Sequence, residues 1–207
     1  MPLCALFPQD KAMSQEQALR LAAVAAEEDS FSYRPRPLHA EILTDLGLVC
    51  ERNQDAGLVL QFVKTQGTEQ PLPISLLILA DGLGGHLQAE EASALAVGVA
   101  AESVVRRLCL PLLVGGQSAA AQTPINEILE TSVYQAHEAV IHRLPEGRTT
   151  LTMVLVLGAG VYVAHVGDTR AYHGRRRAAA AGERLQLLTR DHSMAARLLE
   201  MGQGGDD

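Results

Sequence analysis

The sequence ILADGLGGH, residues 78–86, changes abruptly from an apolar run to an aspartate, three glycines and a histidine. An aspartate that follows a buried strand is costly to desolvate unless a cation meets it, and glycine is favoured where the backbone must bend or approach another group closely. The apolar run ISLLILA, residues 74–80, is typical of a strand that is covered on both faces. The stretch therefore predicts a functional site at the end of a buried strand, around Asp81.

The composition of the 207-residue chain is that of a globular protein, with 47% hydrophobic and 20% charged residues. Its formal net charge of -7 argues against nucleic-acid binding, because that binding depends largely on Lys and Arg side chains that neutralise phosphates. Three widely separated cysteines predict neither a disulfide framework nor a zinc site. The N-terminus lacks the basic region of a secretory signal, and no apolar run is long enough to cross a bilayer. We therefore expect a cytoplasmic protein without a membrane segment.

Hydrophobic periodicity predicts groups of strands with helices between them, which favours an α+β fold. A Pro-containing linker over residues 31–39 divides the chain into an N-terminal extension, residues 1–38, and a main domain, residues 39–207. The strands over 149–157, 161–168 and 169–174 are expected to form an antiparallel meander. We expect helices over residues 14–28, 88–108 and 124–144, and further strands over residues 41–49, 58–65, 74–80 and 185–189.

Three aspartates are candidate ligands of a hard cation, because Asp55, Asp81 and Asp168 each lie in or beside a turn at a predicted strand end. Aspartate is also a common turn residue, so each of them has a purely structural alternative. The glycines beside Asp81 and Asp168 favour the cation site. In contrast, the histidines of HEAVIH, residues 137–142, are five positions apart and therefore predict surface residues and not a zinc helix.

Four blocks occur in a characteristic order: TDLGLVCERNQD (44–55), LADGLGGH (79–86), HVGDTRAY (165–172) and TRDHS (189–193). Through these blocks the chain resembles the metal-dependent serine/threonine protein phosphatases of the protein phosphatase 2C type, especially the bacterial members. The resemblance covers about residue 40 to about residue 203. It implies an αββα sandwich, in which helices flank two antiparallel sheets. It also implies hydrolysis of phosphoserine and phosphothreonine in proteins, with phosphorylated proteins, a Ser/Thr kinase or its substrates, as partners.

The resemblance also implies a set of site residues around two or more Mg²⁺ or Mn²⁺ ions. Asp81 would bridge two ions, the carbonyl of Gly82 would coordinate one of them, and Asp55 would be a further ligand. Asp168 would border a weaker metal position. His86 would be a candidate general acid, and its alternative is a structural role at the start of the following helix.

The sequence departs from the family pattern in two ways. Cys50 stands where bacterial members carry an arginine that holds the substrate phosphate. Arg52 would share the face of Cys50 if both lie on a strand, and is then the candidate that partly substitutes in holding the phosphate. Family members also continue beyond the TRDHS block with two more acidic blocks, whereas this sequence stops at MGQGGDD. We therefore expect the last strands of the sandwich to be missing and catalysis to be impaired. The alternative function is a catalytically impaired phosphatase-like module that binds or regulates a partner.

Overall fold

The computed structural model describes residues 38–48, 52–66, 70–83, 88–114, 123–175 and 184–193, and the backbone of residues 22–24. Within these ranges, no helix is long and apolar enough to span a membrane. The strands are β1 (Ala22–Val24), β2 (Asp55–Lys64), β3 (Leu72–Asp81), β4 (Leu151–Leu157), β5 (Gly160–Val166), β6 (Tyr172–Arg175) and β7 (Arg184–Leu187). The helices are α2 (Ala89–Val104), α3 (Leu110–Val114) and α5 (Ile125–Arg143), and a π-helical segment, η1 (Val105–Cys109), joins α2 to α3.

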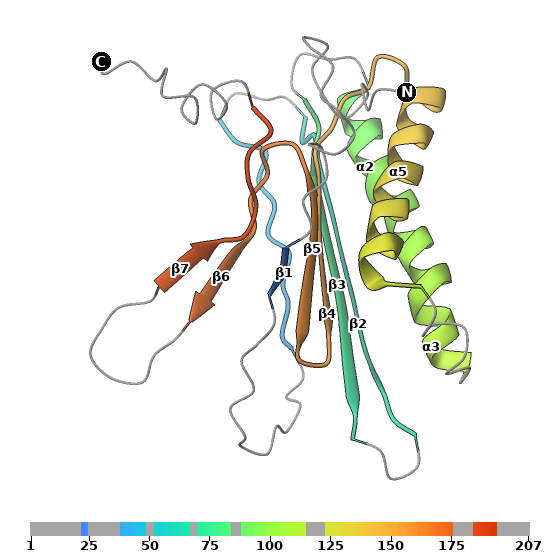
Figure 1. The fold of residues 1–207 in the computed structure, drawn as a ribbon. Coiled ribbons are helices and arrows are strands. Elements are labelled where there is room, and N and C mark those ends of the chain that lie inside the picture. The colour runs from blue at the N-terminus through green and yellow to red at the C-terminus, as the bar shows by residue number, and fades with distance from the viewer. Residues whose placement is uncertain are drawn as a thin grey trace.

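The main sheet has the strand order β1-β5-β4-β3-β2, and all of its neighbouring strands are antiparallel (Figure 1). Strands β4 and β5 are joined by a tight turn at Gly158, whose φ of 59° is one that glycine adopts without strain. Strands β6 and β7 pair with each other in a separate two-stranded sheet. The α+β class and the presence of two antiparallel sheets are thus confirmed.

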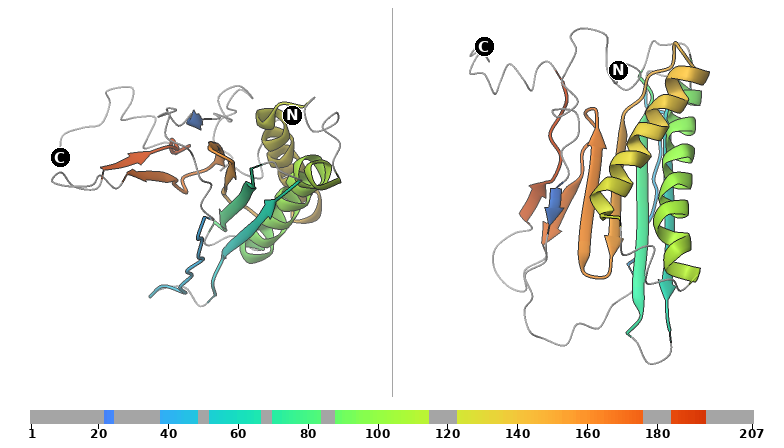
Figure 2. Two further views of the ribbon diagram at one scale, coloured as in Figure 1. Left: turned by 90° about the horizontal axis from the view of Figure 1, so that it is seen from below. Right: turned by 45° about the vertical axis from the view of Figure 1, so that its right-hand side comes forward.

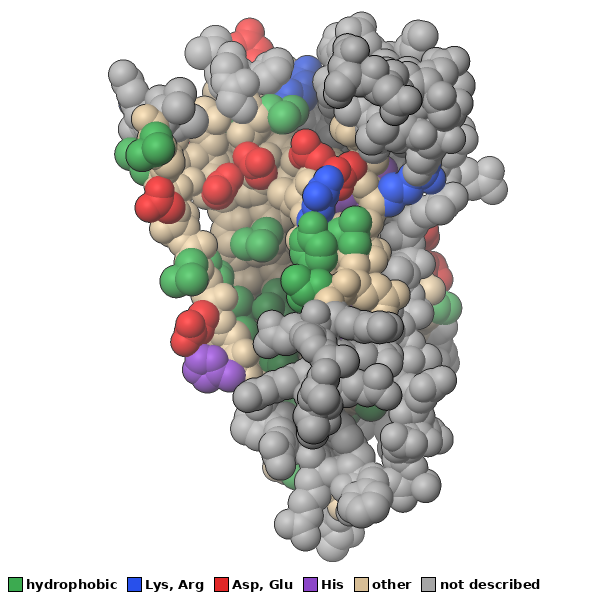
Figure 3. All heavy atoms as spheres, turned by 90° about the vertical axis from the view of Figure 1, so that its left-hand side faces the viewer, with side chains coloured by type: hydrophobic (Ala, Val, Ile, Leu, Met, Phe, Trp, Pro, Cys, Tyr) green, Lys and Arg blue, Asp and Glu red, His purple; other side chains and the backbone are tan. Residues whose placement is uncertain are grey.

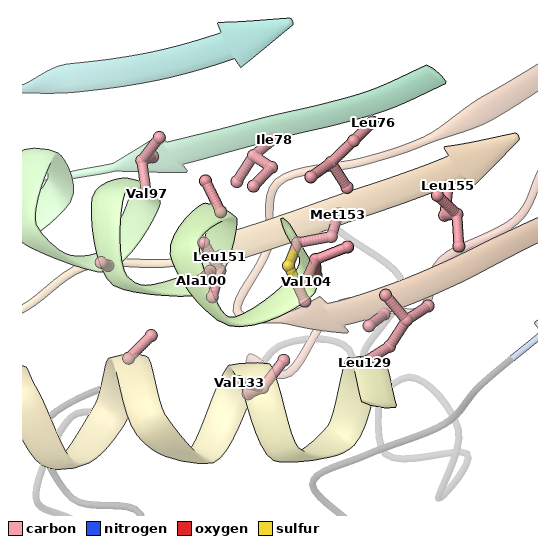
Figure 4. Packing of buried hydrophobic residues seen from close by; sticks show 14 of the residues in the cluster. Leu76, Ile78, Val97, Ala100, Val104, Leu129, Val133, Leu151, Met153 and Leu155 are labelled. Atoms are coloured by element: carbon pink, nitrogen blue, oxygen red, sulfur yellow. The ribbon is translucent and has the colours of Figure 1, made fainter. Parts of the chain in front are cut away.

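One face of the main sheet is covered by helices α2 and α5, which lie side by side (Figure 2). Alternate residues of β3 point toward them, so that Ile74, Leu76 and Ile78 are almost fully buried. They pack with Val104 of α2 and with Leu129 of α5, among others, in a single hydrophobic core (Figure 4). The two long helices were predicted at these positions, and their buried stripes explain why the apolar periodicity was readable.

The opposite face of the main sheet is only partly covered by the described residues. Leu79 of β3 is 51% exposed and Val63 of β2 is 49% exposed. Residues 38–48 run past β2, where the Gln61 amide donates a hydrogen bond to the Leu38 carbonyl at 2.9 Å. The interpretation of β3 as a strand covered on both faces is therefore wrong for its C-terminal part, where the second face is open at Leu79.

Three predicted elements differ from the structure. Residues 41–48 form no strand: the Asp45 carboxylate instead accepts a hydrogen bond from the Gly47 N–H at 2.7 Å and stabilises a turn. The helix expected over residues 14–28 lies mostly outside the described residues, but Ala22–Val24 within it form β1 and pair with β5. The segment after β5 does not continue a meander, because β6 leaves the main sheet and pairs with β7.

The histidines of α5 have different environments. His142 is exposed and lies 3.0 Å from Glu138, one helical turn earlier. His137 is buried, since it shares the stripe of Val133 and Val140 that faces the core. The expectation that both are surface residues is therefore wrong for His137.

The proposed boundary between residues 38 and 39 stays a prediction.

Candidate metal centre

Asp55 and Asp81 lie directly opposite each other in the β2–β3 ladder, at the first residue of one strand and the last residue of the other. Residues paired in this way point to the same face of the sheet, with Cβ atoms about 5 Å apart. Burial, together with the charge and the side-chain contact of Asp55, raises the pKa of Asp81 to about 6, and the charge of Asp168 adds to the effect. A cation between the two carboxylates would remove this repulsion.

The backbone of Asp81 is fixed by two threonines that precede β4. The Thr150 hydroxyl accepts a hydrogen bond from the Asp81 N–H at 2.9 Å, and the Thr149 hydroxyl donates one to the Asp81 carbonyl at 3.0 Å. Both threonines are buried. Neither threonine was predicted to belong to the site, because the contact joins residues that are far apart in the chain.

Gly82 lies in a space that no other residue fits without movement. Its N–H donates to the Gln54 carbonyl at 3.0 Å, and it forms an isolated bridge with Thr149. A Cβ at this position would lie 2.5 Å from the Ala89 carbonyl oxygen and 2.7 Å from the Gln54 carbonyl oxygen. Glycine is therefore required here for close packing of the backbone between β2, β3 and the start of α2.

The carboxylate pair borders a hollow of about 450 Å³ on the face of the sheet away from the helices. Figure 3 looks onto this side of the molecule, where acidic side chains gather above a depression with a hydrophobic floor. The lining combines oxygen-bearing and aliphatic side chains. It consists of Ile42, Leu43, Thr44, Asn53, Asp55, Ala56, Gly57, Leu79, Ala80, Asp81 and Thr169.

Asp168 lies in the loop that follows β5, and contacts with the segment after β7 hold this loop in place. The Gly167 carbonyl accepts a hydrogen bond from the His192 N–H at 2.7 Å, and the Ala171 N–H donates to the Thr189 hydroxyl at 3.1 Å. Gly167 itself has a φ of 110°, which favours glycine. The TRDHS block therefore supports the loop that carries Asp168.

An ion pair also joins the loop after β5 to the segment after β7. The Arg170 guanidinium donates to both carboxylate oxygens of Asp191, at 2.6 Å and 2.9 Å. This bidentate contact holds the pKa of Asp191 below its ordinary value. Arg170 is thus engaged in positioning the loop that carries Asp168.

A buried polar chain leads from this region to the hollow. His165 is only 3% exposed, and its Nδ1 lies 2.8 Å from the Thr152 hydroxyl while its Nε2 lies 3.1 Å from the Arg190 carbonyl. The Thr152 hydroxyl lies 2.6 Å from the hydroxyl of Thr169, which lines the hollow. The HVGDTRAY block contains two of these residues, but sequence reasoning gave neither His165 nor Thr169 a role.

Apart from Arg52, the predicted site residues separate into three groups. Asp55, Asp81 and Gly82 are brought together, whereas Asp168 is exposed and acts on Asp81 through its charge. His86 and Cys50 lie outside the described residues. In the ranges that the structure describes, no three side chains of His, Cys, Asp or Glu lie close enough to hold a metal ion.

Arg52 does not have the position that the sequence analysis assumed for it. It lies in a bend before β2, so the argument from alternating faces along a strand does not apply. Its guanidinium is largely exposed and lies 4.0 Å from the Glu90 carboxylate at the start of α2. Arg52 is also absent from the lining of the hollow.

The facing carboxylates of Asp55 and Asp81, of which burial raises the pKa of Asp81, fit the oxygen-rich environment that Mg²⁺ and Mn²⁺ prefer. The tightly packed backbone around Gly82, the Gly82 cradle, adds a carbonyl oxygen beside them. Asp55 and Asp81 supply anionic oxygens, and the surrounding hollow has room for waters to complete a coordination shell. The described residues therefore fit part of a divalent-cation site.

Comparison with known proteins gives consistent results. A family model described as Protein phosphatase 2C matches residues 51–196. The chain is 30% identical to the serine/threonine phosphatase stp of Listeria monocytogenes, over 80% of this chain and 59% of that protein. It is 29% identical to the protein phosphatase PhpP of Streptococcus pneumoniae, over 80% of this chain and 60% of that protein.

Solved structures show the same likeness. The serine/threonine phosphatase PstP of Mycobacterium tuberculosis superposes with a TM-score of 0.50 at 26% identity, covering 90% of this chain and 60% of that one. The phosphatase Stp1 of Staphylococcus aureus gives a TM-score of 0.52 at 25% identity, covering 84% and 63%. The chain thus spans less than two thirds of the length of each relative.

Proposed function

Because the chain belongs to the protein phosphatase 2C family, we propose that it takes part in the hydrolysis of phosphoserine and phosphothreonine in proteins. The family is metal-dependent. The observation that carries the proposal is the face-to-face placement of Asp55 and Asp81 beside the Gly82 cradle, at the edge of an accessible hollow. The substrates would be phosphorylated proteins, among them a Ser/Thr kinase or the substrates of one.

The proposed metal ligands are the carboxylates of Asp55 and Asp81 and the carbonyl of Gly82, with Asp168 beside a weaker position. The ions would be Mg²⁺ or Mn²⁺, two or more in number. When bound, such ions lower the pKa of a water molecule and stabilise the charge of the phosphoryl group as it is transferred. His86 is the proposed general acid for the leaving seryl or threonyl oxygen.

The chain's own contribution is to hold its oxygen ligands rigidly. Thr149 and Thr150 fix both backbone polar groups of Asp81, and the β2–β3 ladder sets the position of Asp55 relative to it. Sites built on strands are positioned more accurately than sites built on loops. These contacts therefore favour a fixed separation between ligands, which a reaction with two ions requires.

One observation favours the alternative function, a phosphatase-like module that binds a partner with impaired catalysis. In the described part of the chain, no basic residue lines the hollow, and Arg52 lies beside Glu90 instead. A phosphate group beside two carboxylates needs a cationic partner, and the position that carries arginine in bacterial relatives is Cys50 in this sequence. The metal site and the phosphate site are therefore separate questions for experiment.

The test combines calorimetric titration with Mn²⁺ and manganese-dependent hydrolysis of a phosphothreonine peptide by the 207-residue chain. Asp81→Asn should abolish both cation binding and turnover, because it removes an anionic ligand. Glu102→Gln is the matched control, since Glu102 is an exposed acid of α2 that contacts Arg106, and it should change neither. Cation binding without turnover would support the non-catalytic alternative. A chain that binds no Mn²⁺ would contradict the metal assignment.

A further inference from the structure

The buried polar chain from Arg190 to Thr169 has a definite direction. The Arg190 carbonyl can only accept a hydrogen bond, so the Nε2 of His165, 3.1 Å away, carries the proton of that contact. A neutral imidazole has one donor and one acceptor nitrogen, so the Nδ1 of His165 accepts from the Thr152 hydroxyl at 2.8 Å. The single hydroxyl proton of Thr152 is therefore used.

The same reasoning determines which group donates in the last hydrogen bond of the chain, at the hollow. Since Thr152 has no second proton, it must accept in its 2.6 Å contact with Thr169, and the Thr169 hydroxyl donates. The proton of Thr169 therefore points inward, and only the oxygen lone pairs are left for the hollow. An unrestrained threonine hydroxyl would rotate and could donate to a carboxylate instead.

These hydrogen-bond directions hold only when His165 is neutral. His165 is buried on β5, where it is the ladder partner of Thr152, and burial lowers its pKa. The ring of His192 lies 5.0 Å away, centroid to centroid, and also has a lowered pKa, of about 4, caused mainly by burial. A neutral His165 is thus consistent with both its position and its neighbour.

We infer that His165 and Thr152 are positioning residues that fix Thr169 as a hydrogen-bond acceptor in the acidic hollow, where it would accept a hydrogen bond from a water molecule bound to the cation. The inference rests on the proposed metal site. Thr169 shares the hollow with Asp55 and Asp81, so a hydrated cation would meet acceptors on each of these sides. A phosphate oxygen would find no donor at Thr169, which assigns this residue to the cation and not to the substrate.

The first experiment is carried out on the unsubstituted chain without metal, and a variant serves only to assign the signals. Long-range proton–nitrogen correlation spectra of the histidine-labelled chain at neutral pH report which ring nitrogen carries the proton, and the loss of one signal set in His165→Gln assigns the residue. The Nε2–H tautomer is the expected result. An Nδ1–H tautomer or an imidazolium would overturn the inference, whatever the fate of the proposed function.

The second experiment measures Mn²⁺ affinity in paired variants. Thr152→Val keeps the shape and removes the hydroxyl, and Thr169→Val does the same at the hollow. Each should weaken binding about tenfold, as is typical when a partner of a metal shell is lost. Thr152→Ser and Thr169→Ser restore the hydroxyl and should stay within about twofold of the unsubstituted chain. Equal losses for Val and Ser would overturn the positioning role.

The two experiments separate this inference from the proposed function. If Asp81→Asn leaves Mn²⁺ affinity unchanged, the proposed metal site fails, and the role of Thr169 toward a cation fails with it. If Asp81→Asn abolishes binding but Thr152→Val does not weaken it, only the inference about Thr169 is wrong. Thermal unfolding of each variant identifies losses of Mn²⁺ affinity that come from misfolding.

Discussion

Thr150 contacts the backbone of Asp81 twice: its hydroxyl accepts from the Asp81 N–H at 2.9 Å, and its own N–H donates to the Asp81 carbonyl at 2.9 Å. The pair joins the end of β3 to the residue before β4. Because the donor and acceptor of Asp81 are both used, the backbone that carries the carboxylate has little freedom to turn. Thr150, together with Thr149, therefore fixes the orientation of a proposed metal ligand that lies 69 residues away from Thr150 in sequence.

Replacement of Thr150 tests this contact. Thr150→Val removes the acceptor for the partly buried Asp81 N–H and should lower the free energy of unfolding by about 1–3 kcal/mol, the cost of an unsatisfied buried donor. Thr150→Ser retains the hydroxyl and should lower the free energy of unfolding by less. Urea unfolding of the cation-free chain measures both. Similar losses for the two variants would show that the methyl group of Thr150 matters and the hydroxyl does not.

Gly82 and Gly98 form a second matched pair. Gly82→Ala places a Cβ against two backbone carbonyl oxygens, which must move, and should destabilise the fold by about 1–3 kcal/mol. Gly98 lies in α2 with nothing within 4 Å of an added Cβ, so Gly98→Ala should stabilise the helix by up to about 1 kcal/mol. Thermal and urea unfolding give both values. A neutral Gly82→Ala would mean that the backbone around the cradle adapts.

The pH dependence of stability follows from the raised pKa of Asp81, about 6 in the folded chain against an ordinary value of 3.8. Between these values the folded state binds more protons than the unfolded state, so the free energy of unfolding should fall as pH rises from about 4 to about 6, and this effect should level off above about 7. Asp81→Asn should remove this dependence and stabilise the cation-free chain at pH 7. Glu102→Gln should leave it in place. Urea midpoints across this range, measured with chelator, provide the check.

Cys50 is the subject of a prediction about phosphate binding. Cys50→Arg should tighten the binding of a phosphothreonine peptide about tenfold, because a guanidinium makes a charge-assisted contact that a thiol cannot make. If the chain turns over, the change should appear mainly as a lower KM. Arg52→Ala should leave binding unchanged, since the Arg52 side chain lies beside Glu90. Weaker binding in Arg52→Ala would show that Arg52 already holds the phosphate.

The elements that were predicted correctly from the sequence are those whose formation depends on neighbouring residues. The apolar strand that ends near Asp81, the helix over residues 88–108 and the strands over residues 149–157 and 161–168 each depend on residues that are near one another in the chain. The order of the four blocks indicated the family. It also indicated that Asp55 and Asp81 would meet, and the ladder places them opposite each other.

The errors arose where tertiary partners decide the outcome. Residues 22–24 have helix-forming side chains, yet they pair with β5, so tertiary contacts outweigh propensity there. The segment 41–48 has apolar residues but pairs with no strand in the described ranges, and a strand without a partner is not stable alone. The roles of Thr150 and Thr152 were not readable, because hydrogen bonds across strands leave no periodic signal in the sequence.

The β2–β3 ladder runs without interruption from the pair Asp55–Asp81 to the pair Lys64–Leu72, a distance of about 30 Å at the usual rise per residue. The length of the connection over residues 65–71 sets which residues of the two strands face each other. If one residue were inserted there and the pairing slipped by one position, the partner of Asp55 would change, and Asp55 and Asp81 would lie on opposite faces of the sheet. The spacing of the acidic pair is thus encoded at the far end of the hairpin, and natural length variation in that connection would be tolerated only if a bulge restores the register.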